Sequence, residues 1–307
     1  MFQRKDYTVY SAKDSNVFDG DIFLGDLPPE QKPNLAIFLS GTGSNAEKML
    51  EDAALRNSVN VVVLVTDAPE KSRAQEIAAQ HDLPVVALSI REFYRQHGLN
   101  TISLATEAGR LVREEWTDTL RKMLENYQID FAVLAGFEPL SNITRDYPCL
   151  NVHPGDLTKL DSSGNRCYVG LHSRPVEKAI LSGEKSLRSS VIIARPFTDA
   201  SKDMDNGLLL GISQPMAIDF GGLELEDLKN IYAARQGKKP AGGWQDELEK
   251  LALRSQNALK ICGDHQILPK VVCDFARRCF AVKGSQLYYR ANPDAEFAPS
   301  DAREYPQ

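Results

Sequence analysis

Short apolar runs alternate with stretches of helical periodicity through the first half of the chain, and this alternation restricts the fold more than any other feature. The runs are typical of strands buried on both faces of a sheet, and they lie at 35–39, 59–65, 84–88 and 131–135. The stretches between them predict helices at 46–55, 72–81 and 107–127. Strands that alternate with helices form parallel βαβ units. We therefore expect an α/β fold with an open, mostly parallel twisted sheet and helices on both faces, of the Rossmann-like kind.

The second half of the chain carries shorter patterns. They predict a strand at 150–153, a helix at 175–182, and a strand pair at 190–194 and 207–212 around a polar loop. Residues 221–243 are predicted to be irregular, and a last large helix is expected from about 244 to 280, broken between 262 and 269.

These elements predict one domain at 33–290 with a peripheral insertion at 219–251. Residues 1–32 form a polar N-terminal extension in which alternating fragments such as 7–10 predict a short hairpin or edge strands. Residues 291–307 predict a mobile tail.

The composition limits the classes of function. The chain has 307 residues, of which 42% are hydrophobic and 25% charged, as in ordinary soluble enzymes. A net charge of −6 argues against a nucleic-acid partner, and no apolar stretch approaches the length of a membrane span or a signal peptide. The five cysteines have no metal-ligand spacing, so we expect no metal site and a reducing, cytoplasmic location.

A glycine-rich segment lies between the first buried strand and the first helix. It consists of Gly41, Thr42, Gly43, Ser44 and Asn45. Glycines let the backbone approach an anion, and a helix N-terminus offers free N–H groups. The segment is not a Walker loop and lacks the third glycine of a dinucleotide fingerprint. From these residues alone, a phosphate site and a tight strand-to-helix turn remain equally open.

Two polar residues end the strand at 150–153. Asn151 and His153 are two apart, so their side chains point to the same face, near the carboxyl edge where open α/β sheets bind ligands. Taken alone, the pair is also compatible with a hydrogen-bonded strand end. Asp205 is followed by Asn-Gly, which by itself is strong turn composition.

Together these motifs resemble the folate-dependent formyltransferases, among them the glycinamide ribonucleotide formyltransferases, from about residue 34 to residue 289. Ser-Gly-Thr-Gly-Ser-Asn resembles the family's phosphate loop, Asn-Val-His-Pro its catalytic Asn-x-His-Pro, and Asp-Asn-Gly the segment of its catalytic Asp. The six matching segments occur in the family's order, and they lie at 40–45, 130–137, 151–154, 170–172, 205–207 and 264–269.

The resemblance implies a role for each matching residue. The catalytic residues would be Asn151, His153 and Asp205. The loop 41–45, His172 and Asp264 would bind the phosphorylated acceptor. Phe137, Glu138 and Leu140 would bind the folate. The donor would be 10-formyltetrahydrofolate, the acceptor a small phosphorylated amine of purine biosynthesis, and no metal would be required. A homodimer is compatible with the resemblance.

The chain departs from the family pattern on the folate side and at the rim. Glu138-Pro139 stands where the family usually has Met-Arg, residues 155–158 replace Ser-Leu-Leu-Pro, and the segments 89–107 and 219–251 are longer than usual. The alternatives are therefore a formyltransferase for an amino sugar nucleotide, a formyltetrahydrofolate deformylase, and a non-catalytic ligand-binding relative. An NAD-dependent oxidoreductase is disfavoured by the missing third glycine.

Overall fold

The computed structural model describes residues 18–196, 205–240 and 242–306 of the chain. Its centre is an eight-stranded sheet in the order β14-β9-β8-β6-β5-β2-β3-β4. These strands are β2 (Asn34–Phe38), β3 (Asn60–Thr66), β4 (Val85–Ala87), β5 (Phe131–Leu134), β6 (Cys149–His153), β8 (Ser190–Ala194), β9 (Leu208–Ile212) and β14 (Arg303–Glu304). Only β8 runs antiparallel to its neighbours among the paired strands of this sheet. The predicted α/β fold with a mostly parallel sheet is confirmed.

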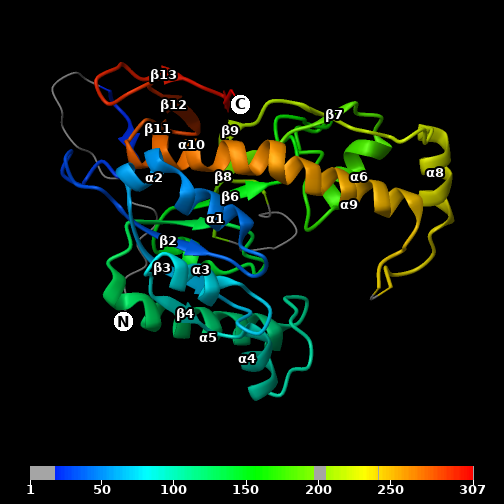
Figure 1. The fold of residues 1–307 in the computed structure, drawn as a ribbon, viewed down its shortest axis with the longest axis horizontal. Helices are drawn as coiled ribbons and strands as arrows, with labels where there is room; N and C mark the ends of the chain where they lie inside the picture. Colours follow the sequence, from blue (N-terminus) through cyan, green and yellow to red (C-terminus); the bar gives the residue numbers. More distant parts are fainter. Residues whose placement is uncertain (1–17, 197–204, 241, 307) are drawn as a thin grey trace.

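Helices cover both faces of the sheet (Figure 1). One face packs against α1 (Ser44–Glu51), α3 (Ala74–Gln80) and α10 (His265–Ala276), and the other against α4 (Ile90–Gln96) and α5 (Glu107–Leu124). Side chains of β2 alternate between the two cores, because Ile37 faces the first and Phe38 the second. This two-sided burial explains the continuous apolar runs of the sequence. The short α2 (Ala53–Ser58) follows α1, which ends at Asp52.

A third core lies at one end of the molecule. There α6 (Arg174–Leu181), α8 (Leu225–Ala234) and α9 (Glu247–Leu259) pack together around Val176, Leu228 and Leu251. The prediction that 221–243 is irregular is wrong where α8 forms. Leu228 is fully buried against the neighbouring helices, and that tertiary contact outweighs the weak local pattern.

The last long helix is not broken as predicted. A π-helical turn at Lys260–Asp264 joins α9 to α10, and Pro269 lies inside α10. Gly263 and Pro269 are typical of a break, but each has a packing role instead. A Cβ at Gly263 would lie 2.4 Å from the Ser189 hydroxyl, so the glycine permits close approach to the sheet. Figure 1 shows α9 and α10 running together across the sheet as far as α8.

The remaining strands lie around the edges. A second sheet contains β1 (Asp21–Ile22), β11 (Phe280–Lys283), β12 (Gln286–Tyr289) and β13 (Ala298–Pro299), and β7 (Ser186–Leu187) pairs with β10 (Met216–Ala217). The predicted tail therefore contributes β13 and β14, while the fragment 7–10 lies outside the described residues. No described helix is both long and apolar enough to cross a membrane.

Candidate active site at the carboxyl edge of the sheet

Several candidate residues lie at or just after the carboxyl ends of the neighbouring parallel strands β2, β5 and β6. Strand β2 lies between β5 and β3. The chain adds β3 and β4 on one side of β2 and then adds β5 and β6 on the other side, so the strand order reverses at β2. The Glu138 N–H donates to the Ser40 hydroxyl at 2.8 Å, which holds the segment after β5 against the end of β2. Open α/β sheets bind ligands at such a reversal of strand order. The segments that contain Gly41, Phe137 and His153 all lie at this edge.

His153 and Asp205 are in direct contact. The Nδ1 atom of His153 lies 3.2 Å from Oδ1 of Asp205, and its Nε2 lies 2.7 Å from the carbonyl oxygen of Tyr168. Both neighbours are acceptors, so the ring satisfies both only when it carries a proton on each nitrogen. The ring thus lies between the Asp205 carboxylate and the Tyr168 carbonyl.

Asp205 is fixed by its own turn. It has a φ of 57°, its Oδ2 accepts from the Gly170 N–H at 3.0 Å, and Arg166 donates to its backbone carbonyl. A Cβ at Gly207 would lie 1.8 Å from the carbonyl oxygen of Ile193, so only glycine lets this turn lie against β8. The Asp-Asn-Gly segment thus forms a turn, and this turn holds the Asp205 carboxylate against His153.

Asn151 and Asp205 line a common pocket of about 100 Å³. Asn151 is half-buried in β6, with Ile192 of β8 as its paired neighbour. His153 does not line this pocket and contacts Asp205 from the interior of the protein. The structure therefore brings the three predicted catalytic residues together, with Asn151 and Asp205 facing the ligand side.

The residues predicted to bind folate line the same pocket. They are Phe137, Glu138 and Leu140. The Phe137 ring packs edge-on against Phe38 with centroids 5.2 Å apart. The guanidinium of Arg113 donates to the carbonyl oxygen of Leu140 at 2.6 Å. Burial lowers the pKa of Arg113. Phe137 and the Leu140 backbone are thus anchored, whereas Glu138 is exposed and pairs with Lys71 at 3.4 Å.

The glycine-rich loop presents free donors. Among the described residues, none accepts a hydrogen bond from the backbone N–H groups of 42–45, which precede and begin α1. Gly43 has a φ of 71°, and a Cβ there would lie 2.4 Å from Ile77. Within the described part of the chain, the buried Oδ1 of Asn45 has no hydrogen-bond partner. Free N–H groups at a helix N-terminus attract an anion.

Asp264 lies directly behind this loop. Its Oδ1 accepts from the Ser189 hydroxyl at 2.5 Å, and its Oδ2 lies 3.5 Å from Nδ2 of Asn45. Burial raises the pKa of Asp264. His172 is separate from both groups: it is exposed before α6, and its carbonyl oxygen accepts from Gln256 at 3.1 Å.

Sequence reasoning missed the groups that hold the pair in place. These are the Tyr168 carbonyl, the Gly170 N–H and Arg166, which belong to the polar loop before α6. Backbone groups leave no mark in a sequence, and Arg166 stands in a loop without periodicity. Among the described residues, no group of three or more His, Cys, Asp or Glu side chains is arranged to hold a metal ion.

Comparisons with known proteins give a family and related folds. A family model described as formyl transferase matches residues 33–202. Among solved structures, phosphoribosylglycinamide formyltransferase from Coxiella burnetii is 19% identical, covers 90% of this chain and 100% of its own, and has a TM-score of 0.56. Glycinamide ribonucleotide transformylase 1 from Symbiobacterium toebii is 17% identical, with coverage of 83% and 92% and a TM-score of 0.54. At these identities the likeness establishes the fold. No curated protein sequence matches the chain.

Proposed function

Because the chain belongs to the formyl transferase family, we propose that it moves a formyl group from 10-formyltetrahydrofolate to the primary amine of a phosphorylated acceptor, with glycinamide ribonucleotide as the first candidate. The observation that carries this proposal is the buried contact between His153 and Asp205, with Asn151 beside Asp205 in the pocket. The family implies a formyl transfer, and the residues indicate how this chain would perform it.

The reaction needs a hydrogen-bond donor for a new negative charge. When the amine attacks the formyl carbon, the formyl oxygen becomes an oxyanion. Asn151 lines the pocket, and its amide N–H can donate to that oxygen without changing protonation state. Loss of such a donor typically lowers the rate by about 10²–10³-fold.

The reaction also needs a group that takes the proton of the attacking amine. Asp205 faces the pocket and is the candidate for this step. The imidazolium of His153 stabilises the carboxylate before the attack, and the Gly170 N–H holds its second oxygen. When the oxyanion collapses, the bond between the formyl carbon and the donor nitrogen breaks, and that nitrogen takes the proton from Asp205; no covalent enzyme intermediate is needed.

The glycine-rich loop supports a phosphorylated acceptor. Its backbone N–H groups lack partners among the described residues, as expected where a ligand supplies the acceptors. A bound phosphate would accept hydrogen bonds from these N–H groups.

The test follows formyl release from 10-formyltetrahydrofolate by the change in folate absorbance, with and without glycinamide ribonucleotide. We expect release only when the acceptor is present, and loss of release in Asp205→Asn. Release that does not depend on the acceptor would identify a hydrolase. No release under either condition, by protein that retains its melting temperature, would contradict the proposal for this acceptor, and amino sugar nucleotides would be tested next.

A further inference from the structure

A large basic cleft lies next to the candidate active site. It has a volume of about 1490 Å³, compared with about 100 Å³ for the pocket of Asn151 and Asp205. Among the described residues, six cationic side chains and one carboxylate line it: Arg166, Arg174, Lys178, Arg235, Lys238, Lys239 and Glu177. The whole chain carries a net charge of −6, so this cationic surface is opposite to the charge of the protein. Such a local field selects an anionic ligand.

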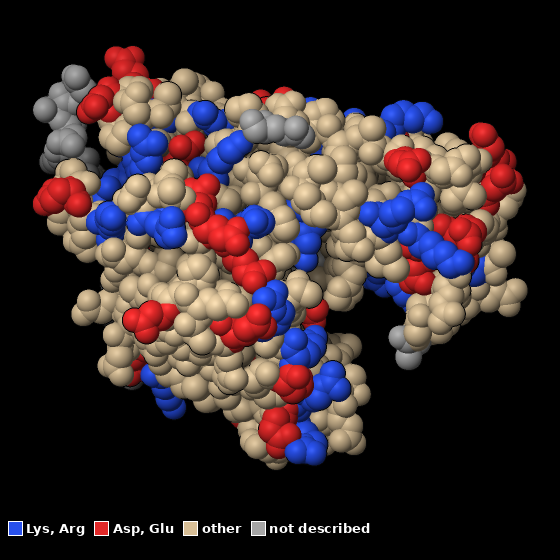
Figure 2. All heavy atoms as spheres, in the orientation of Figure 1, with Lys and Arg blue, Asp and Glu red and all other residues tan. Residues whose placement is uncertain are grey.

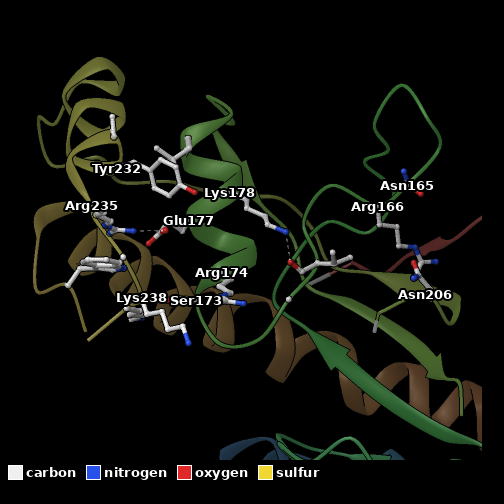
Figure 3. Close-up of a pocket in the computed structure, with 17 residues that line it drawn as sticks. Asn165, Arg166, Ser173, Arg174, Glu177, Lys178, Asn206, Tyr232, Arg235 and Lys238 are labelled. Atoms are coloured by element: carbon white, nitrogen blue, oxygen red, sulfur yellow. Dashed lines mark hydrogen bonds and ion pairs between the residues drawn. The ribbon is translucent and has the colours of Figure 1, made fainter. Parts of the chain in front are cut away.

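Two of the cations have no protein partner among the described residues. Arg235 pairs with Glu177 at 2.7 Å and with Asp246 at 2.8 Å, and Lys239 pairs with Glu249 at 2.6 Å. Arg174 and Lys238 have no such pair. Figure 3 shows the ends of Arg174 and Lys238 in the open part of the cleft, whereas Arg235 turns toward Glu177. The paired residues stabilise the wall, and the unpaired ones are free to meet an anion.

The two walls come from different parts of the chain. One wall is α6 and the loop before it, and the other is the end of α8 and the segment that follows, with Tyr232 and Trp244 on either side of Arg235. Figure 2 shows the surface deeply indented beside the part that carries α8. The longer segment at 219–251 therefore builds one side of the cleft.

The cleft adjoins the residues of the proposed chemistry. Gly170 and Asn206 line it, while their neighbours Leu171 and Asp205 line the smaller pocket. The Gly170 N–H donates to the Asp205 carboxylate, so the two spaces are separated by the thickness of that turn. The cleft and the pocket therefore lie on the two sides of one turn, so a substrate at Asp205 is adjacent to the cleft.

We infer that this cleft binds an extended chain with several anionic groups, attached to one of the two substrates. The inference rests on the proposed function, since it takes the substrates from there. Two sources supply this chemistry: the γ-linked glutamates of a folate donor, or phosphates on the acceptor beyond the one at the glycine-rich loop. Two unpaired cations on different elements fit a chain with separated charges better than a single anion.

The experiment measures binding by calorimetry, apart from turnover. The probes are monoglutamyl and oligoglutamyl tetrahydrofolate, glycinamide ribonucleotide, an amino sugar nucleotide as an acceptor with more than one phosphate, and inorganic tripolyphosphate. Variants Arg174→Gln and Lys238→Gln remove the unpaired cations singly and together. The matched controls are Arg91→Gln and Lys122→Gln, which alter exposed cations outside the cleft.

We expect tripolyphosphate to bind the wild type, and each cleft variant to weaken it by about 2- to 5-fold, as for partly exposed charge pairs. The same variants should weaken the oligoglutamyl folate and leave the monoglutamyl form unchanged if the donor is the source. They should weaken binding of the amino sugar nucleotide, and leave binding of glycinamide ribonucleotide unchanged, if the acceptor is the source. Binding should fall as salt rises.

The inference is overturned if the cleft variants bind tripolyphosphate and every substrate form as tightly as the controls do. Failure of the proposed function has a different signature. In that case neither monoglutamyl folate nor glycinamide ribonucleotide binds the wild type. Binding of tripolyphosphate to the wild type and the cleft variants still measures whether the cleft binds anions.

Discussion

The Nδ1 atom of His153 lies 3.2 Å from Oδ1 of Asp205, and the two side chains are only 3% and 8% exposed. The first residue ends β6 and the second precedes β9, so the antiparallel strand β8 lies between their strands. The contact therefore depends on the part of the sheet in which β8 runs antiparallel to β6 and β9. The close approach of Gly207 to Ile193 is what lets the Asp205 turn reach across β8.

Replacing Asp205 by Asn should lower turnover by about 10²–10⁴-fold, because an amide neither takes the amine's proton nor stabilises the imidazolium of His153. Dissociation constants for both substrates should change little, since the loss falls on the transition state. Single-turnover kinetics and calorimetry measure the two effects. Asp301→Asn, at an exposed position, is the control. Weakened binding with unchanged turnover would show that Asp205 binds substrate and takes no part in the chemical step.

Replacing His153 by Ala should reduce both turnover and stability. The ring is buried and contacts two acceptors, so its removal takes the His153 contact from the Tyr168 carbonyl and from Oδ1 of Asp205, while Oδ2 of Asp205 keeps the Gly170 N–H. A buried group that loses its partner costs about 1–3 kcal/mol. Urea unfolding and single-turnover transfer on the same variant test this. A destabilised variant with normal transfer would show that the residue is structural only.

Replacing Asn151 by Ala should lower the rate of transfer by about 10²–10³-fold, as for loss of one oxyanion donor. The half-buried side chain contributes little to the core, so the melting temperature should remain close to that of the wild type. Asn57→Ala, on the exposed side of α2, is a matched control. Equal rates in the two variants would exclude Asn151 as a donor in the transition state.

The two glycines of the loop should respond differently to alanine. The added methyl group in Gly41→Ala meets no atom within 4 Å, so the stability of the protein should be preserved. The same methyl group would occupy space next to a bound phosphate, so phosphate binding should be weaker. Gly43→Ala combines a φ of 71° with a Cβ 2.4 Å from Ile77, so it should unfold at lower urea concentration. Phosphate titration and urea unfolding separate the two effects. Unchanged phosphate affinity in Gly41→Ala would count against an anion at the loop.

Asp264 should make stability depend on pH. Burial raises its folded pKa above the unfolded value of about 3.9, so its contribution is fully present below that value and is lost as pH rises through the folded pKa. Asp264→Asn removes this titration. The variant should therefore gain stability relative to the wild type as pH rises from about 4. Urea midpoints across a pH series measure the difference. A difference that shrinks with rising pH would contradict the assigned direction.

The first half of the fold was predictable because its signals are local. Strand β2 carries a continuous apolar run, and Gly41–Asn45 marks the turn into α1 without any knowledge of tertiary contacts. The pattern at 150–153 predicted a strand, and the two-residue spacing placed Asn151 and His153 on one face of it. Their relation to Asp205 came from family resemblance, because no rule of spacing joins β6 to the turn before β9.

The parts that were not predicted depend on contacts between distant segments. The helical path through Gly263 and Pro269 follows from packing against β8 and β9, which a local pattern does not contain. Helix α8 is held by one fully buried leucine, Leu228. The basic cleft joins α6 to the segment after α8, and its charges are dispersed in the sequence.

The pairing of β14 with β9 has a consequence for solubility. β14 runs along the outer side of β9, and Tyr305 next to it is buried with its hydroxyl 2.8 Å from the Asp274 carboxylate. Without residues 303–306, the backbone groups of Gly211 and Ile212 would lengthen the open edge of β9, which can pair with another copy of the chain. The last residues thus protect the sheet from self-association. Their removal should be detected first as turbidity on warming, while the chemistry at Asp205 stays intact.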